Sequence, residues 1–265
     1  MPKISLALPV YNGERYLEGC LDSIISQSFE DFELVVSDNA STDSTLEILE
    51  RFAERDPRIR IIRQPKNVGA AQNFNLLFGE TKADIFKWCA HDDRLDPDYL
   101  LETYSALQAA PEAVLAHSHT VIHDMDQNTH EVFAPAFSMT TSDRAMRLRE
   151  VFLHGRRCYE VFGLLRRSAL EKTDLIGNYR GGDNVLLFRL ALLGQFVIVP
   201  KPLFTLGRHT DQSTTLLNNS QAYHAWFTGH RNKVSFPDWI FLFAAWRTTA
   251  GLNLSLSERL RCYKE

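Results

Sequence analysis

The chain has 265 residues, of which 45 % are hydrophobic and 23 % charged, as in a globular protein large enough to bury a substantial core. Its formal net charge of −4 provides no global basic field that would attract nucleic acid or an anionic membrane. The four cysteines are too far apart for a zinc or redox motif, and no apolar run is long enough to span a bilayer. Because Met1 leads almost directly into a strand, we expect no signal peptide and a cytoplasmic location.

The first 115 residues alternate predicted strands and helices. Apolar runs predict strands at residues 4–8, 32–37, 59–62 and 84–90. Helical spacing of apolar residues predicts helices at 16–25, 44–52 and 72–78, and a fourth that begins at Asp96-Pro97 with Asp96 as its N-cap. This alternation predicts an α/β fold, Rossmann-like, with a mainly parallel sheet flanked by helices.

The pattern changes after residue 115. Strands are expected at 113–121 and 131–133, and helices at 142–153 and 184–193. Two short strands, 196–199 and 203–206, are predicted around Pro200 and Pro202, and the chain from about residue 221 is expected to be helical. We therefore predict one α/β domain over residues 1–215 and a helical C-terminal extension over 216–265.

The first two strands each run into a polar, turn-forming cluster that opens a helix. These strand-to-helix junctions carry Tyr11 and Asn12 after the first strand and Asp38 at the end of the second. Parallel strands end at the same edge of a sheet, and open α/β sheets bind ligands there, nucleotides prominent among them. The alternative is that Asn12 and Asp38 only cap turns. Two consecutive junctions favour a nucleotide site.

Adjacent carboxylates, Asp92 and Asp93, follow the fourth strand. Two such charges next to a buried strand are costly unless something neutralises them. Mg²⁺ or Mn²⁺ bound to diphosphate oxygens is a natural partner. The alternative, a solvated loop, suits Asp96 better than it suits the pair.

At this point the sequence resembles a known family. Its motifs are Pro9-Val-Tyr-Asn12, Ser37-Asp-Asn-Ala-Ser-Thr-Asp43, Asn67-x-Gly69, His91-Asp-Asp93 and, less closely, the segment Gly181–Gly194. In this order they are similar to those of the inverting family 2 glycosyltransferases of GT-A fold. The resemblance implies an enzyme that uses a nucleotide-sugar donor, usually a UDP-sugar, together with Mn²⁺ or Mg²⁺.

The resemblance also implies roles for particular residues. Asp183 would be the general base that deprotonates an acceptor hydroxyl. Asp92 and Asp93 would meet the metal, and His209 would reach the metal or the diphosphate unless it is ordinary polar surface. Residues 1–115 would form the nucleotide-sugar half and 116–215 the acceptor half. The donor would be bound by Pro9, Tyr11, Asn12, Asp38, Asn67, Gly69 and Asp92.

Two positions depart from the family pattern. Ala90 stands where the family's D-x-D-D begins, and Gly182 replaces the Glu of its Glu-Asp pair. These departures keep open a non-catalytic nucleotide-sugar-binding protein. A sugar nucleotidyltransferase is a weaker alternative, because the first junction has a single glycine and its first basic residue is Arg15. The absence of G-x-G-x-x-G excludes a dinucleotide-dependent dehydrogenase.

The acceptor is left open as a saccharide or a lipid-linked sugar, as in polysaccharide, lipopolysaccharide or glycolipid assembly. A local cluster of arginines would suit a phosphate-bearing acceptor, although such clusters are more often solvated helix faces. The apolar segment 236–246 is expected to pack on the core or form a homodimer contact, with peripheral contact to the inner face of a membrane as the alternative. The local arginine cluster named above consists of Arg144, Arg147, Arg149, Arg156 and Arg157.

Overall fold

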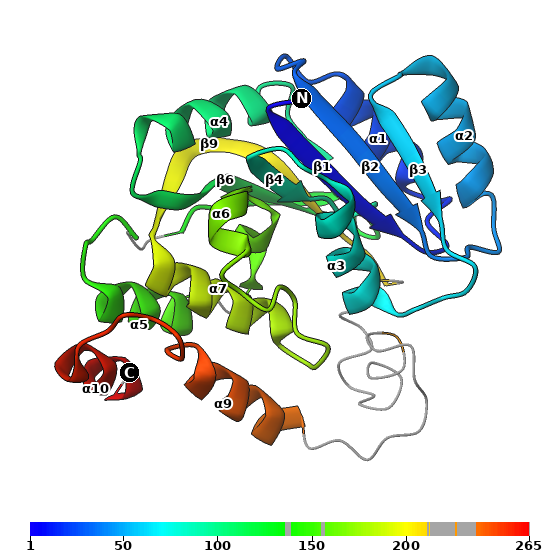
Figure 1. The fold of residues 1–265 in the computed structure, drawn as a ribbon. Helices are drawn as coiled ribbons and strands as arrows, with labels where there is room; N and C mark the ends of the chain where they lie inside the picture. The colour runs from blue at the N-terminus through cyan, green and yellow to red at the C-terminus, as the bar shows by residue number, and fades with distance from the viewer. Residues whose placement is uncertain (136–138, 155–156, 211, 213–225, 227–236, 265) are drawn as a thin grey trace.

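A computed structural model describes residues 1–135, 139–154, 157–210, 212, 226 and 237–264 (Figure 1). Its strands are β1 (Ile4–Val10), β2 (Phe32–Asp38), β3 (Ile59–Arg63), β4 (Ile85–Trp88), β5 (Arg94–Leu95), β6 (Ala113–Asp124), β7 (Thr129–Phe133), β8 (Leu164–Arg166) and β9 (Gln195–Arg208). Its helices are α1 (Leu17–Ile25), α2 (Thr45–Arg55), α3 (Ala70–Glu80), α4 (Tyr99–Ala109), α5 (Arg144–His154), the 3₁₀ helix η2 (Tyr159–Phe162), α6 (Arg167–Leu170), α7 (Gly182–Leu193), α9 (Pro237–Arg247) and α10 (Leu256–Lys264).

The described strands form one sheet in the order β3-β2-β1-β4-β8-β6-β9-β5, with β7 paired to β6. Strands β1 to β4 are mutually parallel where they pair, as the strand–helix alternation predicted. Antiparallel β8 then joins this half to the β6–β9 pair, which is again parallel. The paired positions Val10 and Asp38 show that β1 and β2 end together, so the polar junctions after them share one edge.

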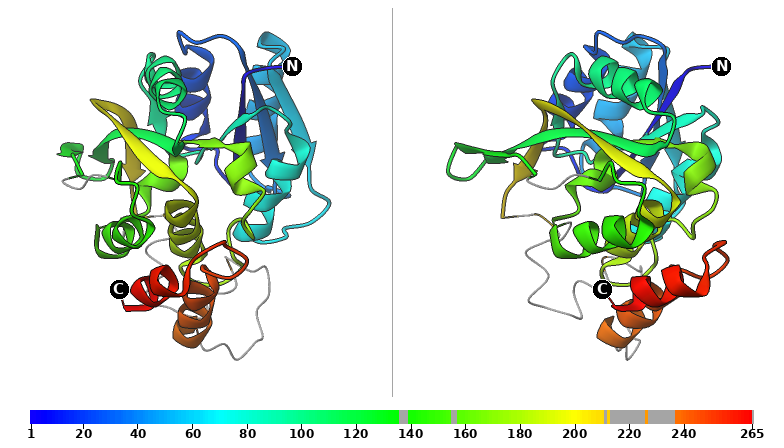
Figure 2. Two further views of the ribbon diagram at one scale, coloured as in Figure 1. Left: turned by 60° about the vertical axis from the view of Figure 1, so that its left-hand side comes forward. Right: turned by 90° about the vertical axis from the view of Figure 1, so that its left-hand side faces the viewer.

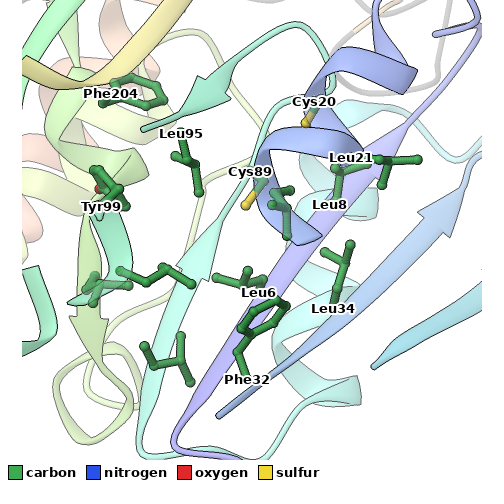
Figure 3. Close-up of a cluster of buried hydrophobic side chains, with 14 of the residues drawn as sticks. Leu6, Leu8, Cys20, Leu21, Phe32, Leu34, Cys89, Leu95, Tyr99 and Phe204 are labelled. Atoms are coloured by element: carbon green, nitrogen blue, oxygen red, sulfur yellow. The ribbon is translucent and has the colours of Figure 1, made fainter. Parts of the chain in front are cut away.

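Helices cover both faces of the sheet (Figure 2). The alternation of β1 sends Leu6 and Leu8 into one core and Ala7 into the other. The first core packs β1 and β2 against α1, α2 and α4; Figure 3 shows it between Phe32 and Phe204. The second core packs the opposite face against α3, α5 and α7. A sheet buried on both faces explains why these strands read as nearly continuous apolar runs.

Two predicted elements need correction. Residues 196–206 form part of one long strand, β9, and not two short ones. The register with β6 shifts where Pro202 pairs with His119, and at such an irregularity proline's missing N–H costs no ladder hydrogen bond. Helix α4 begins at Tyr99 with Asp98 as its N-cap residue, whereas Asp96 was expected to cap it. The Asp96 carboxylate instead accepts the backbone N–H of Asp98 at 3.2 Å, in the turn before the helix.

The predicted C-terminal helices are present as α9 and α10, although most of residues 213–236, including the proposed boundary at 216, lies outside the described residues. Helix α9 packs on α7, with the rings of Phe241 and Phe188 6.2 Å apart. Helix α10 lies beside α5, where Arg261 pairs with Asp143.

Candidate functional site

The two strand-to-helix junctions are held together by hydrogen bonds. The backbone N–H of Asn12 donates to the Ser41 hydroxyl at 2.9 Å, and the Asn12 amide oxygen accepts the N–H of Thr42, also at 2.9 Å. Asn12 adopts the left-handed region, with φ of 51°, which asparagine tolerates better than most residues. The side chain of Asn12 therefore couples the junctions, and Tyr11 next to it remains 40 % exposed at the same edge.

A second set of contacts between the junctions involves residues that the sequence analysis did not single out. The N–H of Gly13 donates to the Thr45 hydroxyl at 2.8 Å, and the N–H of Ser44 donates to the Glu14 carboxylate at 2.9 Å. Burial opposes ionisation of Asp43, but hydrogen bonds from Thr45 and Glu14 outweigh it and hold the pKa of Asp43 below its usual value. The run of Ser, Thr and Asp over residues 41–45 is the sequence signal for such contacts.

The end of β2 is joined to the loop before α3. Asp38 is buried, and its carboxylate accepts the N–H of Ser41 at 3.2 Å. The amide nitrogen of Asn39 donates to Asn67 at 3.1 Å, and the same Asn67 oxygen accepts the N–H of Gly69 at 2.9 Å. Asp38, Asn67 and Gly69 are thus brought to one edge of the sheet with Asn12, as the parallel topology predicts.

The loop after β4 brings Asp92 against the end of β9. The Asp92 carboxylate lies 3.1 Å from Nε2 of His209 and accepts the side-chain N–H of Gln212 at 3.1 Å. His209 is buried, and its ring packs against that of Tyr16 at a tilt of 34°, with a centroid separation of 4.2 Å. Burial opposes ionisation of Asp92, but the contact with His209 and the nearby His91 hold its pKa below its usual value. This carboxylate therefore stays charged.

Asp93 has a different environment from its neighbour. It is buried, and its Oδ1 accepts the backbone N–H of Gly207 at 3.1 Å, while Oδ2 has no hydrogen-bond partner among the described residues. Burial and the charge of Asp92 raise the pKa of Asp93 well above its usual value. Asp92 thus faces His209, whereas Asp93 fastens the loop to β9.

A glycine in β9 makes this contact possible. A Cβ built on Gly207 would lie 2.2 Å from the carbonyl oxygen of Asp92 and 2.4 Å from the side chain of Met125. Strand β9 approaches the Asp92 loop so closely because β5 pairs with it, Arg94 opposite Thr205. A glycine inside a strand is a sequence signal of close backbone approach, and the sequence analysis did not use it.

Asp183 lies in the first turn of α7, whose N-cap is Gly181, so it is not itself the cap. It is partly exposed, and its Oδ1 accepts the N–H of Asn184 at 2.9 Å. The thiol of Cys158 also hydrogen-bonds to Asp183; burial, together with this carboxylate, keeps the pKa of Cys158 well above its usual value. Within the described part of the chain, Asp183 is hydrogen-bonded to Asn184 and Cys158 and not to the loop 91–93.

The sequence profile of the family described as "Glycosyl transferase family 2" matches residues 5–174, which is more than half of the chain. The chain belongs to glycosyl transferase family 2. It is 37 % identical over 105 residues to the glycosyltransferase GlyA of Streptococcus pneumoniae, covering 40 % of this chain and 15 % of GlyA. It is 28 % identical over 207 residues to GlyG of the same organism, covering 74 % of this chain and 67 % of GlyG.

Solved structures of low sequence identity share the fold of this family 2 protein. TarS of S. aureus in complex with UDP-GlcNAc superimposes with a TM-score of 0.71 at 16 % identity, over 99 % of this chain and 71 % of that one. The mannosyltransferase PcManGT of Pyrobaculum calidifontis, in complex with GDP-Man and Mn²⁺, gives 0.62 at 16 % identity, over 99 % and 73 % of the two chains. The fold is therefore GT-A-like, as predicted.

The family profile ends before Asp183 and His209, so the match itself does not cover either residue. Within the match, Ala90 replaces the first acid of the family pattern, and its carbonyl accepts the thiol of Cys20 at 3.2 Å. Among the described residues, no helix has the length and hydropathy needed to cross a membrane.

The second departure, Gly182, has a steric explanation in this family 2 chain. A Cβ built on Gly182 would lie 2.1 Å from the carbonyl oxygen of Gly177 and 2.8 Å from its nitrogen. Real Cβ atoms do not approach backbone atoms so closely, so the segment around Gly177 occupies the space that a glutamate at position 182 would need. Gly182 therefore fits the local fold of this chain.

Proposed function

We propose that the protein is an inverting glycosyltransferase that moves a sugar from a nucleotide-sugar, in the first instance a UDP-sugar, to a hydroxyl acceptor. The observation that carries the proposal is the meeting of four strand ends at one edge: β1 and β2, whose junctions are joined through Asn12, and β4 and β9, after which Asp92 meets His209. The His209 ring lies against Tyr16 of the first junction. One edge then offers both a nucleoside-binding surface and an anionic, imidazole-bearing pair for a diphosphate with its metal.

In this proposal the junctions bind the nucleoside. Tyr11 supplies an exposed ring that can stack on a base, and Asp38 supplies a carboxylate that can accept hydrogen bonds from base or ribose. Hydrogen bonds between the loops hold these groups in place before any donor arrives. The remaining residues proposed for the donor are Pro9, Asn12, Asn67, Gly69 and Asp92.

The residues after β4 and β9 suit a hard divalent cation. Asp92 and His209 converge with carboxylate and imidazole donors, and a buried oxygen of Asp93 has no hydrogen-bond partner among the described residues. No group of three or more His, Cys, Asp or Glu with metal-binding geometry occurs within those residues. Mn²⁺ or Mg²⁺ is the proposed cation, because such ions are commonly held by one or two protein carboxylates, here Asp92 and Asp93, and by phosphate oxygens of the substrate. When bound, the ion stabilises charge on the departing diphosphate.

Asp183 is the proposed general base. Its partly exposed carboxylate takes the proton of the acceptor hydroxyl while that oxygen attacks the anomeric carbon from the side opposite the diphosphate. The new glycosidic bond forms as the bond between the anomeric carbon and the diphosphate oxygen breaks. The electron pair of that bond leaves with the nucleoside diphosphate, and the anomeric configuration is inverted.

The test is release of nucleoside diphosphate across a panel of donors with Mn²⁺. UDP-GlcNAc and GDP-Man belong in the panel, because structures of similar fold contain them. Asp183→Asn is expected to lower turnover by at least about 100-fold while donor binding persists, because the base acts on the acceptor. Asp22→Asn, at an exposed position of α1, is the matched control and should turn over like the wild type.

Two results would redirect the proposal. Tight UDP binding without turnover on any acceptor supports the non-catalytic binding protein, and pyrophosphate release from a nucleoside triphosphate supports a nucleotidyltransferase. Full turnover in excess EDTA would contradict the proposed requirement for Mn²⁺ or Mg²⁺. The chain spans 15 % of the length of GlyA and 51 % of that of a glycosyltransferase of Haemophilus influenzae. The acceptor is therefore also part of the proposal: a saccharide or a lipid-linked sugar, in cell-surface polysaccharide, lipopolysaccharide or glycolipid assembly.

A further inference from the structure

Three helices expose large apolar side chains at one end of the molecule. Helices α5, α9 and α10 gather there in all views (Figures 1 and 2). They carry most of the exposed large apolar residues among those that the structure describes. These are Met146, Phe152 and Leu153 on α5; Trp239, Ile240, Leu242, Phe243 and Trp246 on α9; and Leu256, Leu260 and Tyr263 on α10.

Helix α9 is apolar on more than one side. Phe241 and Ala245 pack on the second core, and the Phe241 ring lies against Gly181, close to the start of α7. Trp239, by contrast, is 73 % exposed, and Phe243 and Trp246 are each more than half exposed. A helix with apolar residues on most sides normally has apolar surroundings on most sides. Among the described residues, the core covers one side of α9 and no other apolar element covers its exposed aromatic side.

Helices α9 and α10 present this surface together. The rings of Trp246 and Tyr263 stack with a centroid separation of 6.0 Å, which joins the exposed aromatic side of α9 to α10. Both helices are far shorter than the roughly 20 residues needed to span a bilayer, so the surface can only lie along an interface. Tryptophan and tyrosine are the residues that favour the boundary between lipid and water.

The charge of these helices identifies the partner. Without Arg147, which is buried, α5, α9 and α10 carry six Lys or Arg against three Asp or Glu, or four with Asp143 immediately before α5, although the whole chain has a net charge of −4. A second copy docked here would bring two basic surfaces together, which costs free energy, whereas an anionic surface would be attracted. Basic side chains around exposed aromatic and aliphatic ones are the composition of helices that lie in an anionic bilayer interface.

We propose that the surface formed by α9 and α10, flanked by α5, docks on an anionic lipid bilayer. Docking buries Trp239, Phe243 and Trp246 at the headgroup boundary and sets the basic side chains against lipid phosphates. Because Phe241 packs against Gly181, docking also holds the first turn of α7, with Asp183, near the membrane. If the proposed transfer reaction holds, a lipid-linked acceptor would meet the base there.

Vesicle flotation without donor or acceptor tests the docking by itself. The wild type is expected to float with vesicles of phosphatidylcholine and phosphatidylglycerol at 70:30 and at least about tenfold less with pure phosphatidylcholine, as expected when several basic residues contribute. The double variant Trp239→Ser, Phe243→Ser should lower partitioning to the anionic vesicles by at least about tenfold. The control Leu101→Ser, Val132→Ser changes two exposed apolar residues on α4 and β7 and should bind like the wild type.

The main alternative is that a second copy of the chain covers this surface, and the mass of the protein in solution distinguishes it from docking on lipid. A dimer that Trp239→Ser, Phe243→Ser converts to a monomer, in a protein that fails to float, would show that a second copy covers the surface. Equal flotation of the wild type and this variant would equally overturn the proposal. Quenching of tryptophan fluorescence by brominated lipid should occur in the wild type and fall in Trp239→Ser, Phe243→Ser. These outcomes do not depend on turnover, so they are separate from the test of the transfer reaction.

Discussion

Replacing Gly182 by alanine tests whether this departure from the family pattern is a steric requirement. The new Cβ would lie 2.1 Å from the carbonyl oxygen of Gly177, a backbone atom that cannot rotate away. Overpacking of this kind costs up to about 3 kcal/mol. Alanine in a helix recovers up to about 1 kcal/mol relative to glycine. The net expectation is a loss of about 2 kcal/mol in the free energy of unfolding, or roughly 4–8 °C in Tm.

Gly79→Ala is the matched control. Gly79 is an exposed residue of α3, and a Cβ there would meet no atom within 4 Å, so the variant keeps the helical gain without the clash. We expect it to be stabilised by up to about 1 kcal/mol. Urea unfolding of both variants and the wild type gives the comparison directly. Equal unfolding free energies for Gly182→Ala and Gly79→Ala would refute the steric reading.

Turnover adds a second readout for Gly182→Ala. Gly182 adjoins Asp183, so relieving the clash by moving the start of α7 also moves the proposed base. A displacement of about 1 Å can cost roughly 100-fold in rate. The assay should run at a temperature where the variant is fully folded, so that lost activity is not lost protein. Reduced turnover with unchanged donor affinity is the expected pattern.

Three further predictions follow from single residues. Gly207→Ala should weaken Mn²⁺-dependent donor binding, measured by calorimetry, because its Cβ would push β9 away from Asp92; unchanged affinity would contradict the proposed role of that contact. Burial lowers the pKa of His117 to about 4, so the unfolded chain binds more protons below about pH 6.5 and stability falls as the pH drops toward 4. This titration should lower the free energy of unfolding by about 2 kcal/mol between pH 7 and pH 5. Urea unfolding of His117→Gln at the two pH values should lack this loss. Arg147→Met leaves two carbonyl oxygens without their donor and should cost about 2–3 kcal/mol, whereas the exposed Arg51→Met should cost less than about 1 kcal/mol; similar losses in these two variants would count against the buried contacts.

The N-terminal half of the fold was predictable because its signals are local. Strands β1 to β4 are short and mainly apolar, and a polar segment follows each of them before the next helix begins. Parallel pairing then follows from the crossover rule, and with it the shared edge on which Tyr11, Asn12 and Asp38 lie. Local pattern and topology were enough to place these three residues together.

The second half was less predictable because pairing between distant residues decides it. Pro200 and Pro202 indicated a break, but β9 continues because its partner β6 accommodates a change of register there. Lys87 stands in an apolar strand, and its buried ammonium donates to the carbonyl oxygens of Trp88 and Phe162. Nothing within residues 85–88 could reveal the acceptor on η2, although a lysine in so apolar a run signals a buried polar contact.

The arginine cluster at residues 144–157 also shows that contacts with distant elements cannot be predicted from a local pattern. Arg147, grouped in the sequence with four neighbours as a candidate phosphate contact, is buried and donates to the carbonyl oxygens of Ala191 and Thr141. Its helix, α5, therefore uses this arginine to hold α7 in place. The spacing of basic residues along the chain cannot distinguish an inward from an outward arginine, because that depends on the element packed against the helix.

The family match ends before the last residues of the candidate site. The match ends at residue 174, yet the partner of Asp92 is His209, delivered by β9 after it pairs with β5 and β6. The base proposed at Asp183 also lies beyond the match. The proposed site therefore takes residues from beyond the matched part of the sequence, and the end of β9 is held to the loop after β4 by the hydrogen bond from the N–H of Gly207 to the carboxylate of Asp93. At Gly207 and Gly182 a Cβ would lie 2.2 and 2.1 Å from a backbone carbonyl oxygen, so the close approach of another backbone segment requires glycine at both positions.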